Sequence, residues 1–461
     1  KTRPVPGLRV IDCVSLAIVD APNDCQYFAL SYVWGSRQPA PSHATDNGYR
    51  LRACQIPAVI RDAILVTLAL GFRFLWVDQF CIDQNDGPQK LEQIAQMDKI
   101  YSRAALTLVA AAGDSASYGL PGVSRPRLAQ KVRVVSGVAM IQIFRHTHVQ
   151  LTTSKWATRD WTFQEFMLSP RRLIFAEDQI SFVCNTSHYA ETVKRPLDPP
   201  SFQEWYNLGV FAGMIPTNHI SALAGGEIQL KMLWLGLTIE QLKNYTSREL
   251  SHPQDALNAV MGLFNWLEPQ GIRQVHGIPM KRLEGNSSLL SFSIQWSHMS
   301  PGTRRHPFPS WSWAGWRGGI HIHNTESVVP RDCRVDLVGI DGRIVSLQGW
   351  FNQQESMAER SELAISTFDA APILQITTLA VSLGFEERSW AGLRSQRGRE
   401  YIDGLYAVLP IREGITAMAY VFLDDENESL PLEGDILGLA LGTQRSLPKR
   451  GHEIHAILVV R

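Results

Sequence analysis

The stretch ALTLVAAAG, residues 105–113, decides the fold class. It is an apolar run that ends in glycine, which is typical of a strand in a parallel sheet that helices cover on both faces. Two earlier segments have the same character, YFALSYVWG at residues 27–35 and FRFLWVDQFCI at residues 72–82. We therefore predict three strands at these places, paired in parallel.

The segments between these strands have the spacing of helices. IPAVIRDAILVTLALG, residues 56–71, has a proline suited to a first helical turn and a glycine suited to the position after the last. PQKLEQIAQMDKIYSRA, residues 88–104, places its apolar side chains on one face. Strands that alternate with helices predict a doubly wound α/β fold with helices on both faces of the sheet.

The rest of the chain changes character twice. KVRVVSGVAMIQIF (residues 131–144) indicates a β-hairpin, and RRLIFAEDQISFVCN (residues 171–185) indicates two short strands or one hairpin. We expect an α/β domain over residues 1–195, a mainly helical region packed on it over 196–319, and a β-rich C-terminal domain over 320–461.

Composition limits the classes of partner. The chain has 461 residues, of which 45% are hydrophobic and 19% charged, as in globular proteins. Lys+Arg and Asp+Glu both number 44, so we expect neither a nucleic acid nor a membrane as partner. No apolar run reaches the length of a membrane span.

The cysteines indicate the compartment. There are six, and none forms a CxxC pair or a Cys/His cluster at zinc spacing. We interpret them as free thiols in a reducing compartment, expect a cytoplasmic protein, and predict no metal site.

Polar side chains crowd the carboxyl ends of the first two strands, where open parallel sheets bind ligands. At the end of the first strand stand Ser31, Tyr32, Trp34, Gly35 and Arg37. At the end of the second stand Asp78, Gln79, Cys81 and Asp83. All nine are candidates for a site.

Each candidate also has a purely structural interpretation. Asp78 and Asp83 suit acid/base or metal chemistry, but they also suit turns, where a carboxylate bonds backbone N–H groups. Cys81 is a nucleophile with a distant histidine, or a small hydrophobic residue of the core. SYVWG offers backbone N–H groups to a phosphate, with Arg37 adding charge.

The stretch WATRDWTFQE, residues 156–165, places two tryptophans, an adjacent Arg-Asp pair and a terminal glutamate within ten residues. On a helix Trp161 and Glu165 share a face, and Asp160 and Gln164 share the neighbouring one. A carboxylate beside an indole has a raised pKa, which suits holding ribose hydroxyls or supporting charge at a glycosidic carbon. The structural alternative is an ion pair between Glu165 and Arg159, Arg171 or Arg172.

These motifs, in this order, resemble the heterokaryon incompatibility (HET) domain of filamentous fungi. The resemblance rests on YFALSYVWG, FLWVDQFCIDQND, QIAQMDKIYSRAALTLVAAAG, GLPGVSRPR and RDWTFQEFMLSPRRLIF, and more loosely on SHPQDALNAVMGL and PSWSWAGW. The family usually has an asparagine at the position of Asp83. The resemblance implies a cytosolic fungal protein connected with cell death after non-self recognition.

HET domains are thought to be distant relatives of TIR domains, which have a flavodoxin-like sheet and often cleave NAD. WTFQE resembles the TIR motif in which the catalytic glutamate lies four residues after a tryptophan. The resemblance therefore implies Glu165 as the acid at the centre of a nucleotide pocket. Trp34 and Trp161 would stack on bases, and Arg37 would hold phosphate. Arg159 and Gln164 are the further expected binding residues.

Three functions follow as hypotheses. The first is an NAD glycohydrolase with NAD as substrate and no required cofactor. The second is an enzyme of fungal secondary metabolism that isomerises, cyclises or dehydrates a small apolar metabolite, with Asp78, Asp83 and Glu165 in acid/base roles. The third is a non-catalytic signalling module that self-associates into homo-oligomers.

Overall fold

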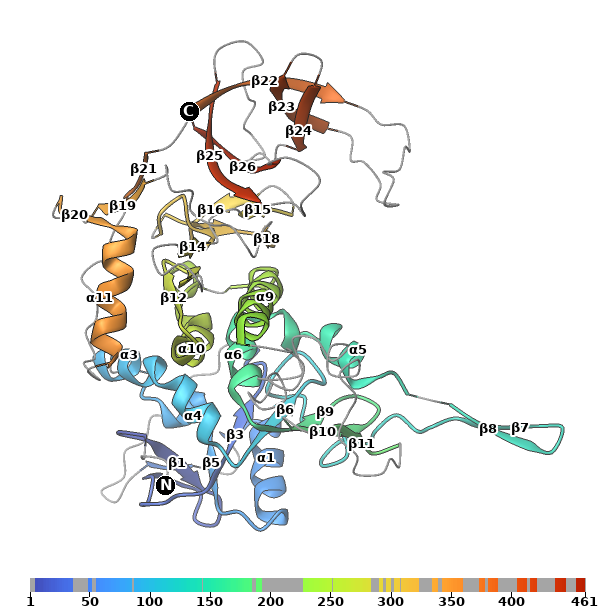
Figure 1. Cartoon of the computed structure of the whole chain (residues 1–461). Helices are drawn as coiled ribbons and strands as arrows, with labels where there is room; N and C mark the ends of the chain where they lie inside the picture. The colour runs from blue at the N-terminus through green and yellow to red at the C-terminus, as the bar shows by residue number, and fades with distance from the viewer. Residues whose placement is uncertain are drawn as a thin grey trace. The chain divides into compact units, whose positions relative to one another are not determined.

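The structure is a computed structural model (Figure 1). It describes residues 5–35, 49–51, 55–84, 87–142, 144–184, 188–192, 227–250, 252–282, 290–292, 296–299, 302–306, 308–322, 334–338, 342–359, 373–377, 380–388, 404–412, 415–420, 436–444 and 453–460. The chain forms two compact units. Unit 1 comprises Lys1–Gly225 and Arg248–Trp266, and unit 2 comprises Gly226–Ser247 and Leu267–Arg461. The domain boundaries expected at residues 195 and 319 stay predictions.

Unit 1 is built on a sheet whose centre is parallel. The parallel strands are β3 (Tyr27–Ser31), β5 (Phe74–Trp76), β6 (Leu106–Ala110) and β9 (Arg171–Phe175). They lie in the order β5-β3-β6-β9. Numbered along the chain, this is the order 2-1-3-4 of flavodoxin-like sheets. The predicted parallel pairing of the first three strands is confirmed.

Antiparallel strands extend both edges, so the nine-stranded sheet is mixed. Beyond β5 lie β1 (Arg9–Asp12), β2 (Ala17–Asp20) and β4 (Tyr49–Arg50). Beyond β9 lie β10 (Ile180–Cys184) and β11 (His188–Ala190). The antiparallel β9–β10 pair agrees with the strands expected over residues 171–185, whereas β1, β2, β4 and β11 were not predicted. The short connections β1–β2 and β9–β10 can join only antiparallel neighbours.

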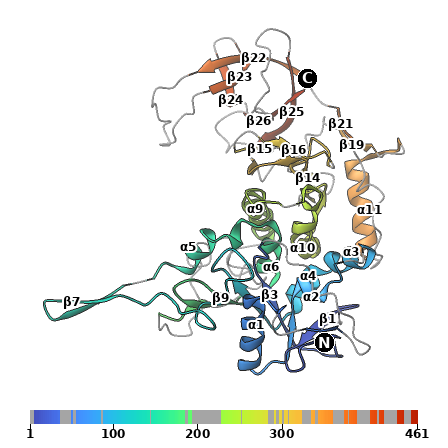
Figure 2. The same cartoon turned by 180° about the vertical axis from the view of Figure 1, so that it is seen from behind.

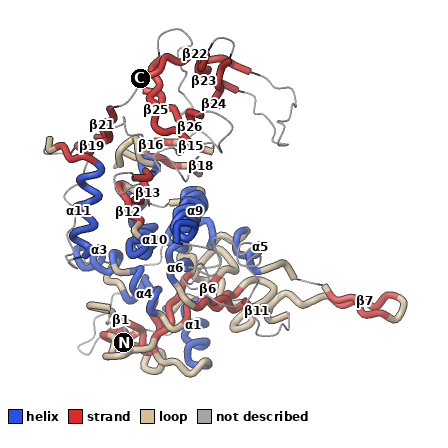
Figure 3. The backbone as a smooth tube through the Cα atoms, viewed as in Figure 1, coloured by secondary structure: helices blue, strands red, loops and turns tan. Residues whose placement is uncertain are grey.

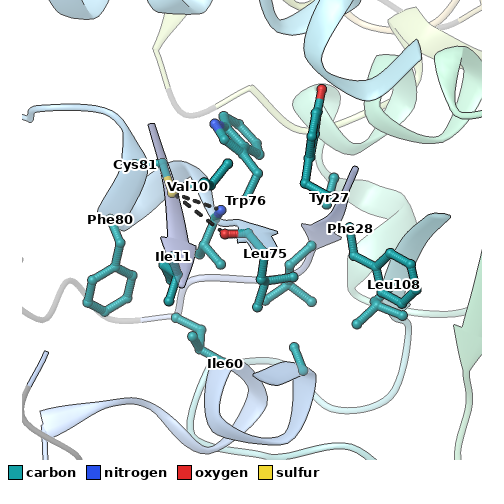
Figure 4. Packing of buried hydrophobic residues seen from close by; sticks show 14 of the residues in the cluster. Val10, Ile11, Tyr27, Phe28, Ile60, Leu75, Trp76, Phe80, Cys81 and Leu108 are labelled. Carbon is teal, nitrogen blue, oxygen red and sulfur yellow. Dashed lines mark hydrogen bonds between the residues drawn. The ribbon is translucent and has the colours of Figure 1, made fainter. Parts of the chain in front are cut away.

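Unit 1 has helices at both places predicted between the strands, and further helices besides. They are α1 (Ala58–Ala69), α3 (Gly87–Ala95), α4 (Met97–Arg103), α5 (Thr147–Thr152), α6 (Asp160–Leu168) and α10 (Asn258–Leu267). The single helix expected over residues 88–104 is divided between α3 and α4, because Gln96 leaves helical geometry with φ −104° and ψ 4°. In Figure 4, Leu75 points toward Ile60 of α1, and Trp76 points to the opposite face of the sheet.

The second predicted strand is shorter than its apolar run. β5 ends at Trp76, and residues 78–81 form the one-turn helix α2 (Asp78–Cys81). The Asp78 carboxylate accepts a hydrogen bond from the backbone N–H of Gln79 at 2.7 Å, and Val77 O accepts from the backbone N–H of Cys81 at 2.8 Å. The polar end of the run therefore turns into a helix, because Asp78 satisfies an otherwise unbonded amide of its first turn.

Unit 2 contains α9 (Glu227–Thr246), α11 (Leu347–Glu359) and antiparallel strands, which are distinguished by colour in Figure 3. The strands are β12 (Ile272–Val275), β13 (Ile278–Arg282), β14 (Leu290–Phe292), β15 (Trp296–His298), β16 (Thr303–Arg304), β17 (Trp316–Arg317), β18 (Ile320–Ile322), β19 (Arg334–Val338), β20 (Ile344–Ser346), β21 (Ile373–Thr377), β22 (Ala380–Arg388), β23 (Gly404–Arg412), β24 (Ile415–Tyr420), β25 (Ile436–Gln444) and β26 (Glu453–Val460). The region expected to be mainly helical up to residue 319 thus also holds short strands. Trp313 of PSWSWAGW is fully buried in unit 2 and donates to Gly277 O at 2.8 Å.

A buried carboxylate ties the loop after β6 to α1. Asp62 is fully buried, and its Oδ2 accepts from the backbone N–H of Leu120 at 2.7 Å and from Ser124 Oγ at 2.5 Å. We expect Asp62→Ala to lower the free energy of unfolding by about 2 kcal/mol, because two donors lose their acceptor. Urea unfolding measures this loss, with the exposed Asp20→Ala as control. Equal stability of the two variants would show that Asp62 does not hold this loop.

Candidate functional site

The candidate site lies at the carboxyl ends of β3 and β6. These two parallel strands are neighbours. From β3 the chain continues to β5 on one side of the pair, and from β6 it continues to β9 on the other side. The carboxyl ends of β3 and β6 are therefore the topological switch point, where such sheets bind ligands. Ser31 is the last residue of β3, and α6 brings Glu165 to it. Both side chains are buried, with exposed fractions of 1% and 4%.

A chain of hydrogen bonds fixes the Glu165 carboxylate. Trp156 Nε1 donates to Ser31 Oγ at 2.8 Å, and Ser31 Oγ donates to Glu165 Oε2 at 2.5 Å. Ser169 Oγ donates to the backbone carbonyl of Glu165 at 2.6 Å. The carboxylate is therefore held by Ser31 of β3, while Ser169 bonds the backbone of the Glu165 helix.

A second carboxylate and a cation complete the cluster. Trp34 Nε1 donates to both oxygens of Asp78, at 3.2 and 3.0 Å. Arg159 Nη1 donates to Tyr32 O at 3.1 Å, and the Tyr32 hydroxyl donates to Gln79 Oε1 at 2.9 Å. Residues of the SYVWG, DQFCIDQ and WATRDWTFQE segments thus meet at one place.

Burial determines the protonation of both carboxyl groups. Desolvation and the charge of the nearby Asp78 together raise the pKa of Glu165 to about 7, against the opposing effects of Ser31 and Arg159. Desolvation raises the pKa of Asp78 to about 6, against hydrogen bonds from Gln79 and Trp34 and the charge of Arg159. Both groups therefore titrate near neutral pH, and the charge of Asp78 disfavours ionisation of Glu165.

The structural alternative for Glu165 is pairing with an arginine, and of the three arginines only Arg159 acts on its charge. Arg172 is fully buried, and its guanidinium donates to Phe166 O at 3.1 Å and Val183 O at 3.4 Å. Arg171 is exposed. Of the three arginines considered, Arg159 is the one whose charge lowers the pKa of Glu165.

Cys81 lies in the hydrophobic core, beside Val10, Ile11 and Trp76 in Figure 4. Its sulfur accepts from the backbone N–H of Val77 at 3.4 Å, and burial raises its pKa to about 12. A thiol with so high a pKa is a poor nucleophile at neutral pH. The geometry therefore favours the core interpretation of Cys81.

Asp83, Gln164 and Trp161 are further predicted residues that the structure describes. Asp83 is partly exposed, in a turn that Gln84 closes through its amide. Gln164 Oε1 accepts from the backbone N–H of Gly262 in α10 at 3.4 Å. Trp161 packs partly buried against the core. Arg37 lies outside the described residues.

Gly35 fixes how the two strand-end loops meet. Its φ is +77°, and a Cβ at this position would stand 2.6 Å from Ser115 Cβ, in the loop after β6. A side chain at Gly35 would be strained by the backbone conformation and would force these loops apart.

Two members of the cluster were not predicted as site residues, Trp156 and Tyr101. Trp156 stands in the quoted WATRDWTFQE stretch, but the helical spacing drew attention to Trp161 instead. The sequence pattern indicates Tyr101 only as part of the apolar face of the helix expected over residues 88–104. Its hydroxyl donates to Leu30 O at 3.2 Å, and the same phenol lowers the pKa of Glu165.

Residues 27–165 match the family described as heterokaryon incompatibility protein (HET). This part of the chain is a HET domain. The match runs from the first residue of β3 to Glu165, so the HET domain contains the whole cluster of Ser31, Asp78, Arg159 and Glu165. No curated protein and no solved structure matches the chain. The relation of this HET domain to TIR domains stays an expectation.

The described residues lack a metal cluster and a helix of membrane-spanning length and apolarity. They contain no group of three or more His, Cys, Asp or Glu side chains that could hold a metal ion. No helix in the described part of the chain is long and apolar enough to cross a membrane.

Ser31 gives a direct test of the hydrogen-bond chain. Ser31→Ala removes the acceptor of the Trp156 indole and the donor to Glu165, both in a buried place. We expect the free energy of unfolding to fall by about 1–3 kcal/mol and the pKa of Glu165 to rise, because the Ser31 bond lowers it. Thermal unfolding across a pH series measures both effects. The exposed Ser102→Ala is the control, and equal behaviour would remove Ser31 from the cluster.

Proposed function

We propose that the HET domain cleaves NAD at the bond between nicotinamide and ribose, with Glu165 beside the reacting ribose. The observation that carries this proposal is the buried carboxylate of Glu165, hydrogen-bonded to Ser31 at the switch point of a sheet in flavodoxin order. Enzymes that break glycosidic bonds place a carboxylate beside the bond that is cleaved.

The chemistry suits a preorganised carboxylate. The glycosidic C–N bond breaks with its electron pair leaving on nicotinamide, and positive charge develops at ribose C1. Water then adds to C1 and loses a proton. The ionised Glu165 would accept hydrogen bonds from ribose hydroxyls and stabilise the developing cation. The cation itself would favour ionisation of the carboxyl, whose pKa of about 7 leaves it poised near neutral pH.

The neighbouring side chains suit the rest of a dinucleotide. Trp34 and Trp161 are partly exposed indoles, and we assign them to stacking on nicotinamide or adenine. Arg159, which is partly exposed, suits a charged contact with the substrate, and Arg37 stays the candidate for the phosphates. Asp78 would tune the pKa of Glu165 through its charge. No metal or cofactor takes part in this scheme.

Nicotinamide release from NAD tests the proposal. The purified full chain at high concentration, with and without a crowding agent, should release nicotinamide and the matching ribose product in equal amounts. Liquid chromatography measures both products. If concentrated protein releases neither, with or without the crowding agent, the proposal fails.

One observation favours a second function. Asp78 and Glu165 have raised pKa values of about 6 and about 7, so near pH 7 one can hold a proton while the other accepts one. That arrangement suits acid/base isomerisation, cyclisation or dehydration of a small apolar metabolite. A screen of extracts for small molecules that bind the wild-type protein and lose binding in Asp78→Asn would favour this function over NAD cleavage.

A further inference from the structure

A two-stranded hairpin of unit 1 stands apart from the rest of its unit. It consists of β7 (Val132–Val135) and β8 (Val138–Ile141), paired antiparallel from Val132 and Ile141 to Val135 and Val138. Ser136 and Gly137 close it with φ of 51° and 81°, as in a type I′ turn. Figures 1 and 2 both show it extending away from β9 and β10.

The hairpin is apolar on both faces and covered on neither. Every residue of both strands is exposed. Six large apolar side chains are between 53% and 70% exposed, namely Val132, Val134, Val135, Val138, Met140 and Ile141. An isolated hairpin is marginally stable in water, and exposed apolar patches of this kind mark binding surfaces. The hairpin therefore gains stability from a partner surface.

The charged residues within the hairpin segment are all basic. Between Asp114 and Asp160 the sequence contains no acidic residue. Lys131, Arg133 and Arg145 are exposed, and among the described residues no ion pair joins any of the three. The balance of 44 basic and 44 acidic residues over the whole chain hides this local excess of cations. These cations favour a partner surface that is anionic as well as apolar.

From the two-sided apolar hairpin and its cationic base, we propose that this segment docks on an anionic lipid surface. Lipid can surround both faces of a hairpin, whereas a groove on a protein covers one. Lys131 and Arg133 would meet anionic headgroups while the valines and Met140 enter the boundary of the acyl chains. The unpaired strand edges keep the hairpin at the wet interface, because they cannot enter the hydrocarbon core.

A second copy of the chain is the main competing occupant. Antiparallel pairing of two β7 edges would bring Lys131 and Arg133 of one copy toward the same cations of the other, which disfavours it. Pairing through the β8 edge meets no such charge, so the test below includes self-association as an outcome.

Vesicle flotation of the full chain tests the proposal without any nucleotide. The protein should float with vesicles of phosphatidylcholine and phosphatidylserine and stay behind with phosphatidylcholine alone. Lys131→Gln with Arg133→Gln should weaken binding by about 30-fold. Val134→Thr, Val135→Thr and Val138→Thr together keep β-branched side chains in the strands but should weaken binding at least about tenfold.

Matched controls come from the same unit. Val14→Thr changes another exposed valine, and Arg61→Gln with Lys99→Gln removes two exposed cations outside the hairpin. Both should bind anionic vesicles like the wild type. The proposal is overturned by absent binding, by equal binding to neutral vesicles, or by hairpin variants that bind like the controls. A dimer in light scattering that the triple threonine variant abolishes would overturn it in favour of self-association.

Discussion

Glu165→Gln should reduce nicotinamide release from NAD by about two orders of magnitude or more and leave the fold intact. Glutamine keeps the volume of the side chain and can still accept the hydrogen bond from Ser31. It loses the negative charge that would face the developing cation, and a group of that kind is typically worth this much. Initial rates of nicotinamide release from wild type and variant give the ratio.

The same substitution should stabilise the protein at alkaline pH. Burial raises the pKa of Glu165 from 4.5 to about 7, so between these values the folded state binds more protons than the unfolded state. The free energy of unfolding therefore falls as pH rises through this window, and above pH 7 the whole loss of up to about 3 kcal/mol is present. Glutamine removes this loss, so the melting temperature at pH 8 should increase.

These two outcomes separate a functional Glu165 from a structural one. Lower activity with equal or higher stability at pH 8 supports a functional group held at a cost in stability. A lower melting temperature at pH 8 would instead indicate that the charge of Glu165 holds the fold together. A stable variant with undiminished nicotinamide release would remove Glu165 from the proposed site.

Arg159→Gln should destabilise the protein in a pH-dependent way. The charge of Arg159 lowers the pKa of both Glu165 and Asp78. Without it, two largely ionised carboxylates face each other at pH 8, and we expect the free energy of unfolding to fall by about 2 kcal/mol there. At pH 5 both groups are mostly protonated, so the loss should be small. Urea unfolding at the two pH values measures the difference.

Arg159→Lys is the control for that prediction. It keeps the charge but loses the planar guanidinium that donates to Tyr32 O. It should therefore retain the stability of the wild type at pH 8 more nearly than Arg159→Gln does. An equal fall at both pH values in the glutamine variant would mean that Arg159 acts through its hydrogen bond to Tyr32 and not through its charge.

The centre of the fold was predictable because its signals are local. Apolar runs such as ALTLVAAAG form strands only when both faces are covered, and glycine and proline mark the ends of α1. The antiparallel edges were harder to predict, because β4 has only two residues. The break between α3 and α4 at Gln96 has no sequence signal, since glutamine is a good helix former.

The sequence indicates which segments contribute to the candidate site, but not which of their side chains contact one another. The rule that ligands bind beyond the carboxyl ends of parallel strands selected Ser31 and Asp78, and the resemblance to TIR domains selected Glu165; the structure places Ser31 and Glu165 in contact. The rule does not say which side chains of a helix turn inward, so Tyr101 and Trp156 were missed. Cys81 was included by position along the chain, although its side chain packs into the core.

A crystal structure with a non-cleavable carbocyclic analogue of NAD tests the central claim most directly. We predict that the ring replacing the nicotinamide ribose lies at the carboxyl ends of β3 and β6, with a hydroxyl within about 3 Å of the Glu165 carboxylate. Trp34 or Trp161 should stack on a base of the analogue. An analogue bound elsewhere on the chain, with Glu165 sealed away from it by its present neighbours, would contradict the proposed function.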